Sequence, residues 1–261
     1  MTNLHRLLEE GQIRKALALV TTDEDMWENI ITYLEDTDES IQRAAFEVVA
    51  QVGNHPNLLD ALPMLISGLE SGEEVICRFA AEALLHLKAD AADAIEALAD
   101  LLDHDDSELR RAVARVIAVI GPPVVEILDK LIEALSDSDE VVRGEAAFAI
   151  RNIGSDAEEA VTPLIELLLD EEEFVHEGKV VEVRSAAAEA LGKIGSGAVS
   201  ALLDVLRDER PEIRFVVIRT LARIGSLPHE AIKDLEDALQ DPDENVQAAA
   251  RQALKRIKSE D

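Results

Sequence analysis

Apolar and small residues recur along this chain at the spacing of one helix face. The clearest stretch runs from Val183 to Gly195 and reads VRSAAAEALGKIG. Counted from Arg184 as position zero, apolar or small residues occupy positions −1, +3, +6, +7 and +10, which form one stripe of an α-helix. This pattern occurs seven times, and the residues at position zero are called anchors: Gln42, Cys77, Arg110, Arg143, Arg184, Arg214 and Gln247.

The distance between anchors defines a repeating unit. Successive anchors are 35, 33, 33, 41, 30 and 33 residues apart. A second apolar block precedes each anchor, and its last Leu lies eight residues before the anchor in every copy except the fifth. Each unit is therefore predicted to be two antiparallel helices, which bury their apolar faces only when neighbouring units stack. The predicted fold is all-α, a solenoid of about seven such helical hairpins.

Residues 1–21 precede the first unit and are predicted to form a helical cap, because Leu4, Leu7 and Leu8 make one short apolar face. Residues 22–261 are predicted to form the solenoid as a single elongated domain, because no Gly/Ser-rich or Pro-rich tract divides them. No uninterrupted apolar run reaches the roughly 18 residues of a membrane span, and the N-terminus does not resemble a signal peptide. The single Cys suits a reducing compartment, so a cytoplasmic location is expected.

Turn residues support this division into hairpins. Short acidic side chains precede the anchors, where they are expected to cap the second helix of each unit. They are Asp36, Asp137, Asp208 and Asp241 six residues before an anchor, and Asp38, Asp106, Asp139 and Asp243 four residues before one. Gly154 and Gly195, eleven residues after their anchors, are expected to end the second helix in the left-handed conformation.

The fifth unit carries eight extra residues near Glu171–Gly178, EEEFVHEG. Insertions into repeats map to loops on one edge of the array, and such loops often bind partners. Phe174 and Val175 favour a binding role, whereas the acidic residues around them fit a tolerated, solvated loop. Both interpretations are open.

The anchor region resembles the HEAT-repeat family, in the short variety that is also found in phycobilin lyases. The matching features are the Val/Ile-Arg pair, the Ala-Ala pair, Ala-Leu and Ile-Gly, over roughly residues 22–258. The resemblance implies a solenoid whose second helices line a concave side, with anchor arginines bonded to turn carboxylates. The family includes scaffolds, adaptors and a few enzymes, so the resemblance alone leaves function open.

The balance of charge is strongly acidic. Asp and Glu number 55 against 25 Lys and Arg, for a net charge of −30. A Lys-poor acidic surface on an ordinary apolar core is expected of a halophilic archaeon, where high salt screens the self-repulsion. An acidic mesophilic protein is the alternative interpretation. The charge also argues against nucleic acid as the main partner.

Positive charge nevertheless gathers in the second helices. The seven segments from each anchor to position +11 hold 17 Lys and Arg but only 4 Asp and Glu. Anchor arginines and residues near helix C-termini have structural explanations. Six arginines remain beyond these explanations: Arg43, Arg78, Arg111, Arg115, Arg219 and Arg251. The second-helix face is therefore expected to be basic relative to the rest of the chain.

Two aromatic residues accompany these arginines. Positions +1, +5 and +8 are neighbours opposite the buried stripe, so Phe148 and Phe215 are expected to face solvent. An exposed aromatic pair surrounded by Arg has the composition of a protein-binding hot spot. The alternative is that either ring packs against a neighbouring helix. The predicted partner-binding residues are Arg111, Arg115, Phe148, Arg151, Phe215 and Arg219, with Phe174 in the inserted loop.

Catalytic patterns are not apparent. Deoxyhypusine hydroxylases share this type of fold and place His-Glu pairs just after the anchor, but His176-Glu177 and His229-Glu230 lie outside that register. The six His show no ligand spacing, so no metal or cofactor is expected. The predicted function is a non-catalytic scaffold or adaptor that binds an acidic or amphipathic protein, without nucleic acid or membrane. A lyase-like or metal-dependent HEAT-repeat enzyme, or a subunit of one, is the alternative.

Overall fold

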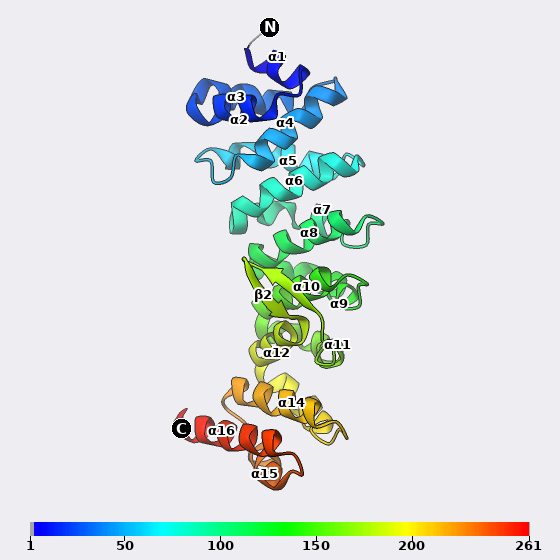
Figure 1. The fold of residues 1–261 in the computed structure, drawn as a ribbon, viewed down its shortest axis with the longest axis vertical. Coiled ribbons are helices and arrows are strands. Elements are labelled where there is room, and N and C mark those ends of the chain that lie inside the picture. Colours follow the sequence, from blue (N-terminus) through cyan, green and yellow to red (C-terminus); the bar gives the residue numbers. More distant parts are fainter. Residues whose placement is uncertain (1–2, 261) are drawn as a thin grey trace. The chain divides into compact units, whose positions relative to one another are not determined.

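The repeats fold into pairs of helices, as seen in a computed structural model that describes residues 3–260. The chain divides into two units, and the boundary lies between Pro123 and Val124. Figure 1 labels the elements of both units. Each unit is described by itself below.

Unit 1 contains the first three hairpins and the two helices that precede them. The helices α1 and α2 occupy the segment predicted as a cap and pack against α4. Its elements are α1 (Asn3–Glu9), α2 (Ile13–Thr22), α3 (Glu24–Tyr33), α4 (Glu39–Gln51), η1 (Leu58–Ala61), α5 (Leu62–Leu69), α6 (Glu74–Leu87), η2 (Lys88–Ala94), α7 (Ile95–Ala99) and α8 (Ser107–Ile120). The second helices α4, α6 and α8 pack in that order.

Unit 2 contains the other four hairpins and the insertion. After η3 (Pro122–Ile127) at the boundary, its elements are α9 (Leu128–Ala134), α10 (Glu140–Ile153), η4 (Gly154–Ala160), α11 (Val161–Leu167), β1 (Glu173–His176), β2 (Lys179–Glu182), α12 (Val183–Ile194), η5 (Gly195–Ala198), α13 (Val199–Val205), α14 (Pro211–Ile224), α15 (His229–Asp237), η6 (Ala238–Gln240) and α16 (Glu244–Glu260). The helices α10, α12, α14 and α16 form one layer, and α11, α13 and α15 form the other. Unit 2 is therefore a two-layer stack.

The all-α solenoid predicted from the anchor spacing is confirmed, with one small β-hairpin added. Every anchor lies near the start of the second helix of its helical hairpin. The predicted caps form: the Asp139 carboxylate accepts hydrogen bonds from the backbone N–H groups of Val141 and Val142. Gly154 ends α10 at φ 72°, a conformation that glycine adopts without steric cost. Local sequence rules thus set the helix boundaries.

Small side chains build most of the core. Ala residues on the second helices are almost completely buried, for example Ala147 and Ala187, which lets neighbouring helices approach closely. Trp27 of α3 is buried as a packing residue. Cys77 is a buried thiol whose Sγ donates to the Leu69 carbonyl oxygen at 3.2 Å, and burial raises its pKa. No helix in residues 3–260 has the length and apolar character needed to cross a membrane.

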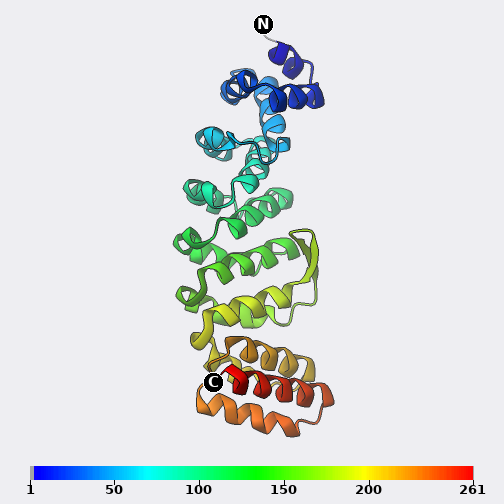
Figure 2. The ribbon, with the colours of Figure 1, turned by 90° about the vertical axis from the view of Figure 1, so that its left-hand side faces the viewer.

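The insertion in the fifth sequence repeat forms an antiparallel β-hairpin. Phe174 pairs with Val181, and Val175 pairs with Val180. The turn between the strands is Glu177–Gly178, and both residues have positive φ, as tight two-residue hairpin turns require. The strand β1 packs against α10, and β2 leads directly into α12 (Figure 2). The insertion is therefore a folded hairpin and not an irregular loop: its acidic residues are exposed, as the solvated interpretation expected, but Phe174 is buried.

Candidate functional site

Anchor arginines join consecutive hairpins of unit 2. The guanidinium of Arg214 donates from Nε and Nη2 to both carboxylate oxygens of Asp241, at 2.8 Å each, across two hairpins. Its Nη1 also donates to the carbonyl oxygens of Asp208 and Glu209. The hydrogen bond from Arg214 holds the pKa of Asp241 below its ordinary value. The carboxylate ladder that the HEAT resemblance implied is therefore present at this joint.

Arg143 makes the equivalent joint one level earlier. Its Nε donates to Asp170 at 2.7 Å, its Nη2 donates to Glu172, and its Nη1 donates to the Asp137 carbonyl oxygen at 2.8 Å. The acceptor Asp170 lies 27 residues after Arg143, the same separation as between Arg214 and Asp241. Arg143 and Arg214 thus follow the same rule, because each binds an aspartate that lies beyond the first helix of the next hairpin.

Arg184 departs from that rule. Asp208 lies six residues before the next anchor, as Asp241 does, so it would be the acceptor for Arg184. However, Arg210 already binds the Asp208 carboxylate at 3.0 and 2.9 Å and lowers the pKa of Asp208 to about 2. The Nε atom of Arg184 is buried and has no hydrogen-bond partner among the described residues. The Glu182 carboxylate lies 3.6 Å from this Nε atom, and the Glu171 carboxylate lies 3.5 Å from Nη2 of Arg184. Arg184 therefore keeps unused hydrogen-bonding capacity.

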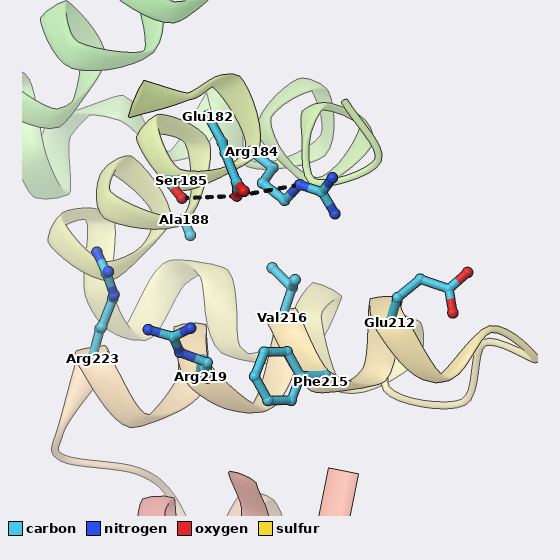
Figure 3. A pocket seen from close by; sticks show the side chains of 9 residues that line it. All are labelled: Glu182, Arg184, Ser185, Ala188, Glu212, Phe215, Val216, Arg219 and Arg223. Atoms are coloured by element: carbon cyan, nitrogen blue, oxygen red, sulfur yellow. Dashed lines mark hydrogen bonds and ion pairs between the residues drawn. The ribbon is translucent and has the colours of Figure 1, made fainter. Parts of the chain in front are cut away.

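A cleft of about 320 Å³ lies beside Arg184, between α12 and α14 (Figure 3). Its lining is Glu182, Arg184, Ser185 and Ala188 on one side, and Glu212, Phe215, Val216, Arg219 and Arg223 on α14. The cleft thus combines three guanidinium groups with an aromatic ring. Arginine and aromatic side chains are enriched at the centres of protein interfaces.

Phe215 lines the cleft on α14, between Arg219 and Glu212 along that helix, and is half-buried. The guanidinium carbon of Arg219 is 5.6 Å from the centroid of the Phe215 ring. Arg219 is exposed and makes no ion pair with any described residue, whereas Arg223 lies 3.4 Å from the Glu189 carboxylate. Arg219 can accept an acidic group without losing an internal ion pair.

The opposite side of Phe215 lines a second hollow, of about 330 Å³. Its other lining residues are Pro211, Glu212, Asp243 and Asn245. This hollow contains carboxylates and no Lys or Arg, unlike the cleft on the α12 side. Phe215 and Glu212 therefore line both a cleft that contains arginines and a hollow whose charged lining residues are carboxylates.

Phe148 does not face solvent, which corrects the sequence-based expectation. It is 3% exposed, because the hairpin lies over it. The rings of Phe174 and His176 lie 5.9 and 4.1 Å from the Phe148 ring, centroid to centroid. Phe174 is also 3% exposed, so it anchors the hairpin to α10 and presents no ring to solvent. Both sequence-based interpretations treated the insertion as a loop, whereas it folds into a hairpin that covers part of α10.

Two polar features fix the hairpin on α10. The Nδ1 atom of His176 is 2.7 Å from the carboxylate of Glu145, which is 2% exposed. At Gly144, a Cβ atom would lie 2.2 Å from the Phe174 ring, so only glycine leaves room for that ring. The exposed side of the hairpin carries Val175 and Val180.

The seven predicted partner-binding residues are divided between the units. Arg111 and Arg115 lie half-buried on α8 of unit 1, and Arg111 pairs with Glu108 at 2.8 Å. Unit 2 brings the others into two groups: Phe215 with Arg219, and Phe148 with Arg151 and Phe174. Arg151 lies over the Phe148 ring at 4.6 Å and pairs with Glu189 at 3.1 Å.

Sequence reasoning missed four residues of these two groups. Arg184 was assigned a structural role as an anchor, and Arg223 was assigned to the helix C-terminus. Glu145 and His176 were missed because a buried acid–histidine pair has no local signature. The alternation of Phe174 and His176 was a usable signal, since residues two apart share a strand face.

Among the described residues, no group of three or more His, Cys, Asp or Glu side chains is arranged to hold a metal ion.

These features define the chain as an α-solenoid repeat protein with an arginine-lined cleft on its second-helix layer. It belongs to the HEAT-repeat family. The family model for HEAT repeats matches residues 27–118, 95–177 and 176–255, which together cover most of the chain. No curated protein sequence matches this chain.

Solved structures with similar folds include natural and engineered proteins. An engineered protein is 26% identical with a TM-score of 0.62, over 94% of this chain and 71% of the other. The archaeal HEAT-like repeats protein from Thermococcus onnurineus is 16% identical with a TM-score of 0.59, over 98% and 96%. A structure described for Kap95p binding to RanGDP is 13% identical with a TM-score of 0.67, over 98% of this chain and 39% of the other. The latter two similarities establish the fold alone.

Proposed function

We propose that this protein is a non-catalytic interaction scaffold or adaptor that binds a partner protein on the second-helix layer of unit 2. The observation that carries the proposal is Arg219, an exposed guanidinium without an ion-pair partner beside the half-buried Phe215 ring. Such an arginine–aromatic pair offers a partner both apolar area and a charge-assisted hydrogen bond. A HEAT-repeat solenoid is a suitable frame for such a surface.

The other predicted contact residues have different parts in this proposal. Arg151 would contribute through its guanidinium, while Phe148 and Phe174 act indirectly by holding the hairpin in place. Arg111 and Arg115 belong to unit 1, and a partner contact there is a separate part of the proposal. Phe215 and Arg219 are the centre of the proposed surface.

A protein partner suits the cleft better than nucleic acid does. Glu182 and Glu212 line the same cleft as the arginines, and the chain as a whole carries a net charge of −30. A phosphate backbone gains affinity by neutralising successive charges on Lys and Arg, and it would be repelled by these carboxylates. A protein segment can alternate its charges to match.

Replacing Arg219 with glutamate is expected to weaken partner binding by at least about tenfold, because a charge-assisted contact becomes a repulsion. The measurement is affinity capture from a lysate of the source organism, with recovered proteins quantified by mass spectrometry. The matched control is Arg14→Glu, the same charge change at an exposed residue of α2. A partner retained by the wild type and R14E but lost by R219E supports the proposal. Equal recovery by all three, or no specific partner, contradicts it.

We also propose that the protein functions in the cytoplasm of a halophile. The chain has 55 acidic and 25 basic residues, which supports this proposal. Repulsion between the excess negative charges destabilises the folded state at low salt. The melting temperature is expected to rise by several degrees between about 0.1 M and 1 M KCl, where the screening length falls from about 10 Å to about 3 Å. Sucrose at matched osmolality controls for solute exclusion. A melting temperature that KCl leaves unchanged would count against the halophilic proposal.

A further inference from the structure

We infer that unit 2 recognises an extended peptide segment whose charges follow a fixed order along α14. An acidic side chain of the segment lies beside Arg219 and Arg223, an apolar side chain contacts Phe215, and a basic side chain lies beside Glu212 and Asp243. This inference rests on the proposed scaffold function and adds the chemistry of the partner. It fixes the order of charges along the helix, and the selection described below determines the chain direction of the segment.

Phe215 is the starting point because its ring lines both hollows. One hollow separates α14 from α12, and the other includes Asp243 and Asn245 at the start of α16. Arg219 lies two helical turns after Glu212 on α14, which is about 10 Å along the helix axis, and an extended chain advances about 3.3 Å per residue. A segment that follows α14 from Arg219 to Glu212 therefore spans about three residues, with the middle one over the Phe215 ring.

The hollow on the α12 side favours a carboxylate. Figure 3 shows Arg219 and Arg223 on one side of the Phe215 ring and Glu212 on the other. The carboxylate of Glu182 lies near Arg184 and Ser185 and is thereby engaged within the protein. Arg219 has no such carboxylate partner among residues 3–260. An incoming acidic side chain can bind it without displacing an internal ion pair.

The hollow on the α16 side favours a cation. Glu212 is exposed and Asp243 is half-buried, and no Lys or Arg lines this hollow. The Oδ1 atom of Asp243 accepts the N–H groups of Asn245 and Val246 as the cap of α16. Its carboxylate therefore stays in place and remains available to a lysine or arginine of the partner. Arg214, the nearest cation of α14 on this side, is already paired with Asp241.

The two hollows together exclude simpler ligands. A uniformly acidic segment would meet Glu212 and Asp243, and a uniformly basic one would meet Arg219 and Arg223. A single-stranded nucleic acid could stack on Phe215, but its phosphates would face the same carboxylates. Mixed charge in a defined order is the pattern that both hollows accept.

The test starts with a selection from a random peptide library, with peptides of about 12 residues displayed on phage and the full-length protein as bait. Enriched sequences are synthesised with a fluorescent label, and their dissociation constants are measured by anisotropy. Each peptide is compared with a version in which its acidic and basic residues are exchanged. A labelled oligothymidine of about 20 nucleotides is measured beside them.

The protein variants reverse the order of charges on α14. The test variant carries Arg219→Glu and Glu212→Arg, both at exposed positions, and keeps the net charge of the wild type. The matched control makes the same exchange in unit 1, with Arg14→Glu and Glu9→Arg, also at exposed positions. Circular dichroism and melting temperature verify that all three proteins are folded.

The expected result is an enriched acidic–apolar–basic pattern, with the wild type preferring the selected peptide over its charge-exchanged version by at least about tenfold. The α14 variant should reverse that preference, and the unit 1 variant should keep it. Peptides that bind without this order, or a preference that the α14 exchange leaves unchanged, would overturn the inference while leaving the scaffold proposal standing. Failure to enrich any peptide, or binding of oligothymidine alone, would overturn both.

Discussion

Replacement of Arg214 by alanine is expected to lower the free energy of unfolding of the last hairpin, α15–α16, by about 3 kcal/mol. The substitution removes the bidentate pair with Asp241 and two hydrogen bonds to carbonyl oxygens. The side chains of Arg214 and Asp241 are only 13% and 10% exposed, so water replaces these bonds poorly. In a repeat array each hairpin contacts only its neighbours, so the loss should remain local to the C-terminal end.

Hydrogen–deuterium exchange is the measurement that resolves this effect. The backbone amides of α15 and α16 should exchange faster by about two orders of magnitude, while those of α10 should be unaffected. Arg214→Lys should be nearly as damaging as R214A, because lysine cannot reproduce the planar fork that binds both oxygens of Asp241. Arg251→Ala, on an exposed face of α16, is the control. If the backbone amides of α15 and α16 are equally protected in all three variants, Arg214 does not stabilise the contact between the last two hairpins.

The same joint sets a dependence on pH. Because Arg214 lowers the pKa of Asp241 in the folded state, this pair stabilises the protein above the unfolded value of about 3.9. The contribution is lost as the pH falls through the lower, folded value, when Asp241 becomes protonated. In R214A that part of the acid-induced loss of stability should disappear, because Asp241 then titrates near its ordinary pKa.

The regular joints could be anticipated because the period of the sequence is regular. Arg214 is an anchor and Asp241 precedes the next anchor by six residues, so the repeat alone places them together. The failure at Arg184 has a local cause. Arg210 lies two residues after Asp208 and occupies its carboxylate, a competition that a comparison of anchor positions does not reveal.

The cover over Phe148 could not be anticipated in the same way. Position +5 of α10 is exposed in an isolated helix, and only the tertiary position of a segment about 30 residues later decides otherwise. The glycine at position 144 was a trace of that contact, since it leaves room for Phe174. Phe215 lies at position +1 of α14, on the corresponding outward face, but no inserted segment covers it within the described residues, and it remains half-buried. Insertions therefore decide which positions of a repeat surface stay accessible.

The hairpin itself depends on His176, and His176→Ala is expected to destabilise unit 2 by about 3 kcal/mol. The variant loses the hydrogen bond to Glu145 and the ring contact with Phe148. The larger part of the cost comes from Glu145, which is 2% exposed and is left without this partner. Thermal and denaturant unfolding measure the loss, and proteolysis within Glu173–Glu182 should become faster as the hairpin detaches.

A double-mutant cycle separates the hydrogen bond from simple loss of packing. If the unpaired carboxylate of Glu145 dominates, the variant with both Glu145→Ala and His176→Ala should be more stable than the sum of the two single changes predicts. Val175→Ala is the control, because Val175 neighbours His176 but is 50% exposed, and it should change stability by less than about 0.5 kcal/mol. If H176A is as stable as V175A, the hairpin is held by Phe174 alone, and Glu145 and His176 contribute no net stability. If H176A is destabilised as expected, the pair of Glu145 and His176 holds the hairpin over Phe148. Phe148 is then covered, whereas Phe215 on α14 stays accessible.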